Sequence, residues 1–243
     1  MQELLTNFQI DAFCLLAAYH LCPLLINRVN SSHSRLTFLH IITGTGSAIM
    51  EFKSTPLFGG ALRCDLPSTF ADVSEIRQVP DHQEVWLDKN GFTNIIVEIN
   101  QRVSTEEAPT DEDALRFHFK DLAESSAASA ADETKFWASG SAVLSKLPGV
   151  PAYTLFATQH NAKKTKKNPE DFTGVLMMLI RLEKQESDVL ICVNVPHVPG
   201  HYNNADIDLP AQKVGELLDK GGVIRQKVLE TFEVKDWSVF GDD

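Results

Sequence analysis

Two apolar runs in the second half of the chain constrain the fold more than any other feature of the sequence. Val175–Ile180 is continuously apolar, and Val189–Val195 is nearly so. Strands of this composition bury both faces, so the two runs predict the central strands of a sheet that is covered on both sides. The polar link Glu183–Asp188 is short enough only for a hairpin. The two central strands are therefore expected to be antiparallel.

Other segments predict further strands and two flanking helices. Asn90-Gly91 is a tight-hairpin dipeptide, and a helix is expected to begin at Thr110, whose hydroxyl can cap it. His118 in that helix is expected to be a structural hydrogen-bonding residue. Glycines in the last helix weaken its middle and can break it in two. The predicted strands are Ala61–Leu66, Glu84–Asp88, Asn94–Asn100 and Tyr153–Thr158, with a helical turn at Asp72–Arg77 and a last helix from Pro210 or Ala211 that contains Gly221-Gly222.

These elements predict an α+β fold. The expected arrangement is an α/β/α-like sandwich, in which helices flank a central, mainly antiparallel sheet of about six strands. The chain has 243 residues, of which 43% are hydrophobic, enough for a substantial core.

Residues 1–49 differ from the rest of the chain. Ala12–Ile26 is mostly apolar, but it contains His20 and is too short to span a bilayer comfortably. The segment before it is acidic, which argues against a secretory signal. Our hypothesis is that Met50 is the functional start, that residues 1–49 are a disordered or spurious extension, and that 50–243 form a single domain.

The charge of the chain bears on its partners. The net charge is −11, and residues 1–49 contribute none of it. An acidic domain argues against nucleic-acid binding and suits a basic protein partner. Mild acidity also keeps a cytosolic protein soluble, so charge alone leaves the partner open.

No catalytic or metal-binding pattern is apparent in the sequence. There is no G-x-S-x-G elbow, H-E-x-x-H pair, Walker lysine or dinucleotide fingerprint. The four cysteines have no CxxC spacing, which argues against a zinc knuckle or a disulfide framework. His197 and His201 have an H-x₃-H spacing without supporting ligands, and we expect them to be surface histidines in a proline-rich loop. The sequence therefore predicts neither an enzyme nor a cofactor or metal.

The stretch Val79–Trp86 is the strongest candidate for a functional site. Pro80 fixes its own φ and favours an extended conformation at the residue before it, so a turn is expected there. Asp81 is a natural turn residue, and Glu84 begins the strand that follows. The two carboxylates are thus expected together at the rim of a sheet, on rigid backbone. The alternative is an ordinary solvated turn.

This stretch and the residues before it resemble the Ran guanine nucleotide release factor family. The matching positions combine an LFGGA motif, a DVS triplet and a VPD-x-QEV motif within one short region. Weaker likeness appears in an aromatic-HF-x-D segment, where Lys120 departs from the expected acidic residue, and in a closing Ser-x-Phe-Gly pattern. The matching residues are Leu57–Ala61, Pro67, Asp72–Ser74, Arg77, Val79–Asp81 and Gln83–Val85, then Phe117–Asp121 and Ser238–Gly241.

The resemblance implies a fold, a partner and a site. Members of the family resemble PsbP in fold, bind the small GTPase Ran, favour its nucleotide-free state and connect it to nuclear transport. The family's acidic Ran-binding positions fall on Asp81 and Glu84 here. Arg77, Gln83 and Trp86 are weaker candidates for Ran contact, and Trp86 fits the core equally well.

Several further expectations follow from the resemblance. The partner is Ran, with Ran-associated binding proteins as a further possibility, and the protein is expected to be a monomer in nucleus and cytoplasm, without nucleic-acid or membrane partners. Apart from the resemblance, the basic tract Lys163–Lys167 fits either a nuclear-import signal or a solvated hairpin loop. The alternative function is a PsbP-like scaffold or assembly module for another protein.

Overall fold

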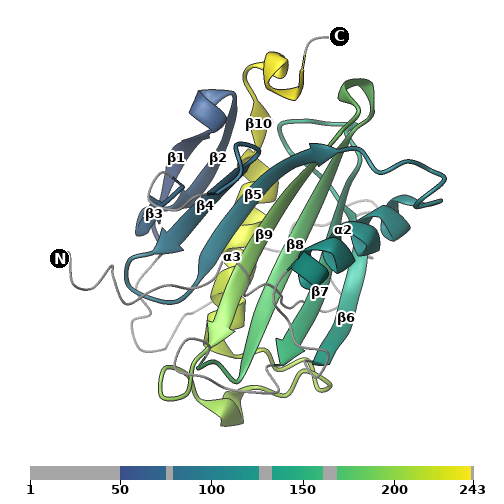
Figure 1. Ribbon diagram of the computed structural model, residues 1–243. Coiled ribbons are helices and arrows are strands. Elements are labelled where there is room, and N and C mark those ends of the chain that lie inside the picture. Colours follow the sequence, from purple (N-terminus) through teal and green to yellow (C-terminus); the bar gives the residue numbers. More distant parts are fainter. Residues whose placement is uncertain (1–49, 75–78, 126–132, 161–168, 242–243) are drawn as a thin grey trace, which may run out of the picture.

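The computed structural model describes residues 50–74, 79–125, 133–160 and 169–241, which form two antiparallel sheets and two α-helices (Figure 1). The seven-stranded sheet has the order β3-β4-β5-β9-β8-β7-β6, and a three-stranded sheet has the order β1-β2-β10. The large sheet comprises β3 (Phe70–Asp72), β4 (Gln83–Asp88), β5 (Asn94–Gln101), β6 (Glu133–Ala142), β7 (Ala152–His160), β8 (Phe172–Leu182) and β9 (Ser187–His197). The small sheet comprises β1 (Phe52–Leu57), β2 (Leu62–Pro67) and β10 (Glu233–Val234).

The two helices cover opposite faces of the large sheet. Figure 1 shows α2 (Asp111–Ser125) in front of the sheet and α3 (Gly215–Thr231) behind it. The first helix contacts β7, whereas α3 contacts β8, β9 and β2 of the small sheet. Three short 3₁₀ segments in the described residues lie between other elements: η2 (Phe58–Gly60), η3 (Glu183–Gln185) and η4 (Asn204–Asp206). A fourth, η5 (Trp237–Phe240), follows β10. The predicted α+β fold with an antiparallel sheet between helices is confirmed.

The predicted central hairpin is confirmed as β8 and β9. Arg181 pairs with Asp188 and Leu182 with Ser187, on either side of the short η3 turn. Every residue of β8 is buried, and so is every residue of β9 except Pro196. Burial on both faces explains why neither run alternates between apolar and polar residues.

In the described part of the chain the large sheet has seven strands, in line with the expected number of about six. The Phe52–Leu57 segment adds the unexpected strand β1, which pairs with β2 through Thr55 and Cys64. The sequence did not predict β1, because Lys53 and Ser54 are polar and exposed and Pro56 is unfavourable inside a strand. An edge strand in a small sheet tolerates this composition.

The last helix is continuous, so the predicted break at Gly221-Gly222 is wrong. A Cβ atom on Gly221 would lie 2.9 Å from Leu176 Cδ1 and 2.9 Å from Val195 Cγ2. Glycine at this position therefore allows α3 to pack directly on β8 and β9. The helix also begins at Gly215 instead of Pro210 or Ala211.

A buried carboxylate joins the central hairpin to α2. Asp188 is fully buried and accepts hydrogen bonds from the Val103 N–H at 3.0 Å and from Arg181 Nε at 3.1 Å. His118 Nε2 on α2 lies 2.8 Å from Oδ2, the oxygen that the Val103 N–H also contacts, whereas Arg181 bonds Oδ1. This contact confirms the structural role predicted for His118. Arg181 also contacts Asp111 at the start of α2, at 2.8 Å. The carboxylate thus fixes the position of α2 on the sheet.

Burial alone would raise the pKa of Asp188, but its surroundings lower it. The hydrogen bonds from His118 and from the Val103 N–H, together with the charge of Arg181, hold the pKa of Asp188 below its ordinary value of 3.8. Because the folded pKa is depressed, the stabilisation is present above the unfolded pKa and is lost as the pH falls through the folded pKa.

Replacing Asp188 should therefore destabilise the protein strongly at neutral pH. We expect Asp188→Ala to lower the free energy of unfolding by about 3–5 kcal/mol, because Arg181 is then left buried without one of its partners. Urea denaturation measures the effect. The matched control is Glu112→Ala, which removes the exposed contacts of Glu112 with Arg116 and with the Ser139 hydroxyl and should cost less than about 1 kcal/mol. The difference in stability between the wild type and Asp188→Asn should shrink as the pH falls below 3.8. Equal losses in Asp188→Ala and Glu112→Ala would contradict this role.

Candidate functional site

The predicted turn before β4 is confirmed. The Gln83 N–H donates a hydrogen bond to the Pro80 carbonyl at 2.9 Å, which closes a tight turn across Asp81 and His82. The Ile99 N–H on β5 donates to the His82 carbonyl at 2.9 Å and attaches the turn to the sheet. Asp81 is exposed, and its side chain makes no hydrogen bond or ion pair with any residue in the described part of the chain. This carboxylate is held on rigid backbone and remains available to a partner.

Glu84 is placed differently from Asp81. Its side chain is half-buried, and its Oε1 accepts a hydrogen bond from the Phe58 N–H at 2.6 Å. Its Oε2 lies 3.4 Å from Trp86 Nε1, a longer and weaker contact. Phe58 begins η2, which follows β1, so Glu84 connects the large sheet to the LFGGA segment of the small sheet.

The backbone conformation of η2 explains why this turn needs the hydrogen bond between Phe58 and Glu84. Phe58 has φ +49°, and Gly59 and Gly60 follow with φ +64° and +97°. A positive φ is unfavourable for an aromatic residue, so the conformation of Phe58 persists only where its surroundings hold it. The hydrogen bond from its N–H to Glu84 is one such restraint.

The environment of Glu84 also changes its acidity. Burial raises the pKa of the Glu84 carboxyl above its ordinary value of 4.5, and the nearby Asp72 charge raises it further. The hydrogen bonds from Phe58 and Trp86 act in the opposite direction without cancelling the effect. The Glu84 carboxylate is therefore less well solvated than an exposed one such as Asp81.

The weaker candidates do not share one surface. Gln83 points to the face of the sheet opposite Glu84, where its Nε2 donates to Glu98 Oε1. Trp86 is on the same face as Glu84, but it is only 7% exposed and belongs to the core. Arg77 lies outside the described residues. Asp72 was predicted to cap a helical turn; its Oδ1 accepts from the Ser74 N–H at 2.9 Å, and residues 75–78 also lie outside the described residues.

The remaining candidates for chemistry are inaccessible or dispersed. Burial raises the pKa of the Cys64 thiol to about 12, and Cys192 is buried as well, so neither is a reactive thiolate. Across the described ranges, no group of three or more His, Cys, Asp or Glu side chains is arranged to hold a metal ion. None of the described helices is long and apolar enough to cross a membrane.

His197 and His201 were both expected to be surface residues, and only one of them is. His201 is exposed, but His197 is fully buried at the end of β9. The expectation was wrong for His197 because β9 extends further than the apolar run that predicted it.

Comparisons with known proteins point to one family. Residues 55–196 match the family model described as Ran-interacting Mog1 protein. The chain is 32% identical over 197 residues to the bovine Ran guanine nucleotide release factor, covering 79% of this chain and 98% of that relative. It is 29% identical to the nuclear import protein MOG1 of Saccharomyces cerevisiae, covering 79% of this chain and 86% of the yeast protein.

A solved structure of a family member supports the same fold. The crystal structure of the S. cerevisiae Ran-binding protein Mog1p aligns with a TM-score of 0.59 and 23% identity, over 79% of this chain and 100% of the yeast chain. The solution structure of PsbP from the cyanobacterium Synechocystis aligns with a TM-score of 0.48 and 13% identity, over 80% of this chain and 98% of PsbP.

The structure predicts that Glu84→Gln and Glu84→Ala have different effects on stability. Glu84→Gln keeps an acceptor for the Phe58 N–H and removes the cost of burying a charge. We therefore expect its free energy of unfolding at neutral pH to equal that of the wild type or to be slightly higher. Glu84→Ala leaves that N–H without its acceptor and should cost about 1–3 kcal/mol.

Urea denaturation as a function of pH measures both effects. A carboxyl with a raised folded pKa stabilises the fold more when protonated, so the wild type should lose stability relative to Glu84→Gln as the pH rises above 4.5. If Glu84→Gln is destabilised as much as Glu84→Ala, the proposed electrostatics of Glu84 are wrong.

Proposed function

This chain belongs to the Ran-interacting Mog1 protein family, and from that membership we propose that it binds the small GTPase Ran and promotes release of guanine nucleotide, in support of nuclear protein import. The family match spans residues 55–196, which include both acidic positions of the turn. The relatives that cover most of this chain are named a Ran guanine nucleotide release factor and a nuclear import protein. These names describe a regulator of a GTPase.

We place the principal contact on Asp81. The observation that supports it is an exposed carboxylate on a hydrogen-bonded turn, with no partner among the described residues. The nucleotide site of a GTPase holds phosphate and Mg²⁺ with a lysine and backbone N–H groups. When the phosphate leaves, a carboxylate offered by a bound protein can pair with that lysine and stabilise the empty site.

Glu84 would contribute in two ways. Its Oε1 holds the η2 turn through Phe58, which fixes the two loops relative to each other. Its Oε2 makes only a long contact with Trp86 and remains able to accept a hydrogen bond from a cation. Glu84 is thus proposed as both a positioning residue and a second contact.

Linkage explains how such binding releases nucleotide. A protein that binds nucleotide-free Ran more tightly than the loaded form must weaken nucleotide binding by the same factor. The rate of release rises when the ternary complex lowers the barrier to dissociation. No group of this chain needs to take part in covalent chemistry, and we propose that it supplies no catalytic residues of its own.

The wider assignment follows from the same proposal. A single Ran-binding domain at 50–243, with 1–49 as an extension, would act as a monomer in the nucleus and the cytoplasm. Arg77 and Gln83 remain secondary candidates for contact. The alternative is a scaffold that keeps this fold for another partner, which would not require an exposed carboxylate at Asp81.

Nucleotide release from Ran tests the function and the site together. The measurement follows a fluorescent guanine nucleotide leaving Ran after addition of the full chain, Asp81→Asn or the control Asp121→Asn. The control changes an exposed carboxylate on α2, which packs on the opposite face of the large sheet near β7. We expect the wild type and the control to accelerate nucleotide release equally. The acceleration by Asp81→Asn should be smaller by a factor of at least about ten. A desolvated charge pair that loses one partner costs roughly 2–5 kcal/mol.

Two results would contradict the proposal at different levels. Undiminished acceleration by Asp81→Asn would show that the turn is not the contact site. No acceleration by the wild type would leave the fold assignment intact and favour the scaffold. Urea denaturation of each variant shows whether a loss comes from unfolding.

A further inference from the structure

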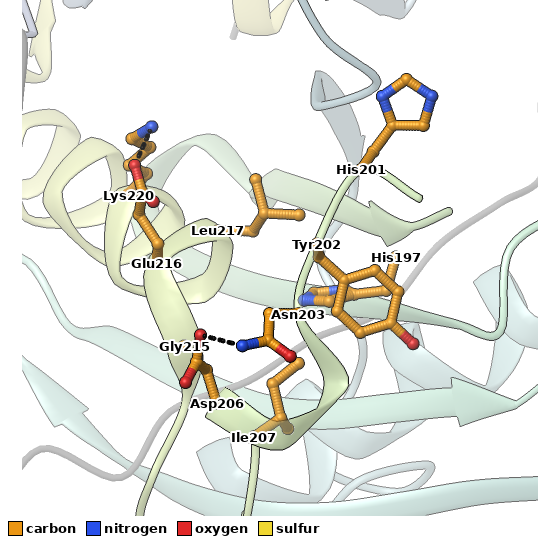
Figure 2. A pocket seen from close by; sticks show the side chains of 10 residues that line it. All are labelled: His197, His201, Tyr202, Asn203, Asp206, Ile207, Gly215, Glu216, Leu217 and Lys220. Carbon is orange, nitrogen blue, oxygen red and sulfur yellow. Dashed lines mark hydrogen bonds and ion pairs between the residues drawn. The ribbon is translucent and has the colours of Figure 1, made fainter. Parts of the chain in front are cut away.

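A pocket lies at the end of the sheet away from the acidic turn. Its volume is about 250 Å³, and it is bordered by the end of β9, the η4 segment and the first turns of α3 (Figure 2). In the sheet register, Gln83 beside the turn pairs with Glu98 late in β5, whereas Asn94 at the start of β5 pairs with Asn194 near the pocket. The pocket is therefore remote from the proposed Ran contact and has no part in that proposal.

The inner wall of the pocket is His197, which has one unpaired nitrogen. The residue is fully buried, and its Nδ1 lies 2.9 Å from the Val195 carbonyl oxygen. A carbonyl can only accept, so Nδ1 carries the proton. In the neutral ring Nε2 is then a bare acceptor. Among the described residues, Nε2 has no hydrogen-bond partner.

The ring of His197 is held in place by aromatic neighbours. Phe172 stacks on it with centroids 4.0 Å apart and an interplanar angle of 14°, and Tyr202 packs edge-on at 4.9 Å. The Tyr202 hydroxyl donates to Asp171 at 2.6 Å, which fixes the tyrosine in turn. Figure 2 shows the imidazole behind the Tyr202 ring, with a nitrogen on the side that Leu217 and Asn203 border. The acceptor is thus preorganised.

His197 stays neutral under physiological conditions. Burial lowers the pKa of its imidazole to about 4, although the Val195 carbonyl and the Asp171 charge act in the opposite direction. An uncharged ring needs a donor from a ligand, not a counter-ion.

The opposite wall of the pocket offers donors. Gly215, Glu216 and Leu217 line it and form the first turn of α3, where N–H groups have no acceptor within the helix. Val214, the residue before the helix, provides no side-chain cap. The start of a helix attracts groups that accept hydrogen bonds.

The charged groups at the rim are already paired. Glu216 lies 2.7 Å from Lys220 Nζ. Asp206 accepts from Asn203 Nδ2 at 3.0 Å and lies 3.5 Å from Lys213 Nζ. A ligand that enters between these pairs meets no uncompensated charge. It meets an acceptor on one wall and donors on the other.

These requirements call for a ligand that both donates and accepts a hydrogen bond. A hydroxyl does so through a single oxygen, whereas a primary carboxamide does so through two atoms that can face the two walls. A carboxylate would satisfy the helix start, but it has no proton to give to His197. An ammonium group would donate to His197, but the positive end of the helix would repel it. We propose that the pocket binds a primary carboxamide, whose NH₂ group donates to His197 Nε2 and whose carbonyl oxygen accepts from the first turn of α3. Such a group occurs on asparagine and glutamine side chains and on small free amides.

A ligand titration monitored at His197 itself tests this proposal. The full chain, labelled with ¹⁵N, is titrated with propionamide, propionate, propylammonium and 1-propanol, and the ¹⁵N shift of His197 Nε2 is recorded. We expect a saturable shift with propionamide at a dissociation constant on the order of 1–10 mM, the range for so small a ligand. The other three should bind at least tenfold more weakly. No shift with propionamide, or tighter binding of any of the other compounds, would overturn the assignment.

A pair of histidine variants provides the matched control. His160 stacks on Phe172 at 5.4 Å but does not line the pocket, so His160→Phe removes an imidazole from the same aromatic cluster without removing the acceptor. We expect His197→Phe to weaken propionamide binding at least tenfold, measured from the backbone amide shifts of Gly215–Leu217, and His160→Phe to leave it unchanged. Equal binding by His197→Phe would overturn the proposal. If that variant does not fold, the wild-type titration decides alone.

A peptide comparison identifies the source of the carboxamide. A pentapeptide with a central glutamine is compared with its glutamate counterpart. Tighter binding of the glutamine peptide than of propionamide supports a polypeptide ligand, and weaker binding supports a free small amide. Equal binding of the glutamate peptide would contradict recognition of a carboxamide.

Discussion

The interaction on which the structure depends is the burial of the Asp188 carboxylate. It lies at the start of β9, one residue pair from the turn of a hairpin whose strands are buried on both faces. A charge in that position is tolerated only when every oxygen is bonded, and the donors come from three separate segments: His118 on α2, Arg181 on β8 and the backbone of Val103. Satisfying one carboxylate thus fixes a helix, a strand and a loop. It also commits α2 to one face of the sheet, which leaves the other face for α3 and the small sheet.

Because α2 and the small sheet lie on opposite faces of the large sheet, the two acidic residues of the turn have different surroundings. Glu84 points to the face that the small sheet approaches, and its bond to the Phe58 N–H connects the two sheets at their common edge. Asp81, three residues earlier, remains outside this contact and is exposed. The two acidic residues therefore differ in their surroundings. Glu84 holds the η2 turn through a half-buried carboxyl whose pKa is raised by burial, whereas Asp81 is exposed on the turn. We propose that a basic partner docks on both, and the hydrogen bonds that already hold the turn would reduce the conformational entropy lost on binding.

The features that the sequence predicts well are those determined by local chemistry. The apolar runs predict the β8–β9 hairpin, and Pro80 predicts the turn that presents Asp81. Features that depend on distant residues escaped prediction. The strand β1 is polar and contains Pro56, and it is a strand because it pairs with β2. Gly221 reads locally as a helix breaker, yet it is needed where α3 touches Leu176 and Val195. The hydrogen bond between Glu84 and Phe58 joins residues 26 positions apart.

The most direct test of the proposed Ran contact at Asp81 and Glu84 is amide hydrogen exchange of the full chain with and without nucleotide-free Ran. We expect slower exchange on binding at His82–Val85 and, because Glu84 holds the Phe58 N–H, at Phe58–Gly60 as well, with unchanged exchange at Gly215–Leu217 beside the remote pocket. Protection confined to α2 or β6, with both segments of the acidic edge unchanged, would contradict it.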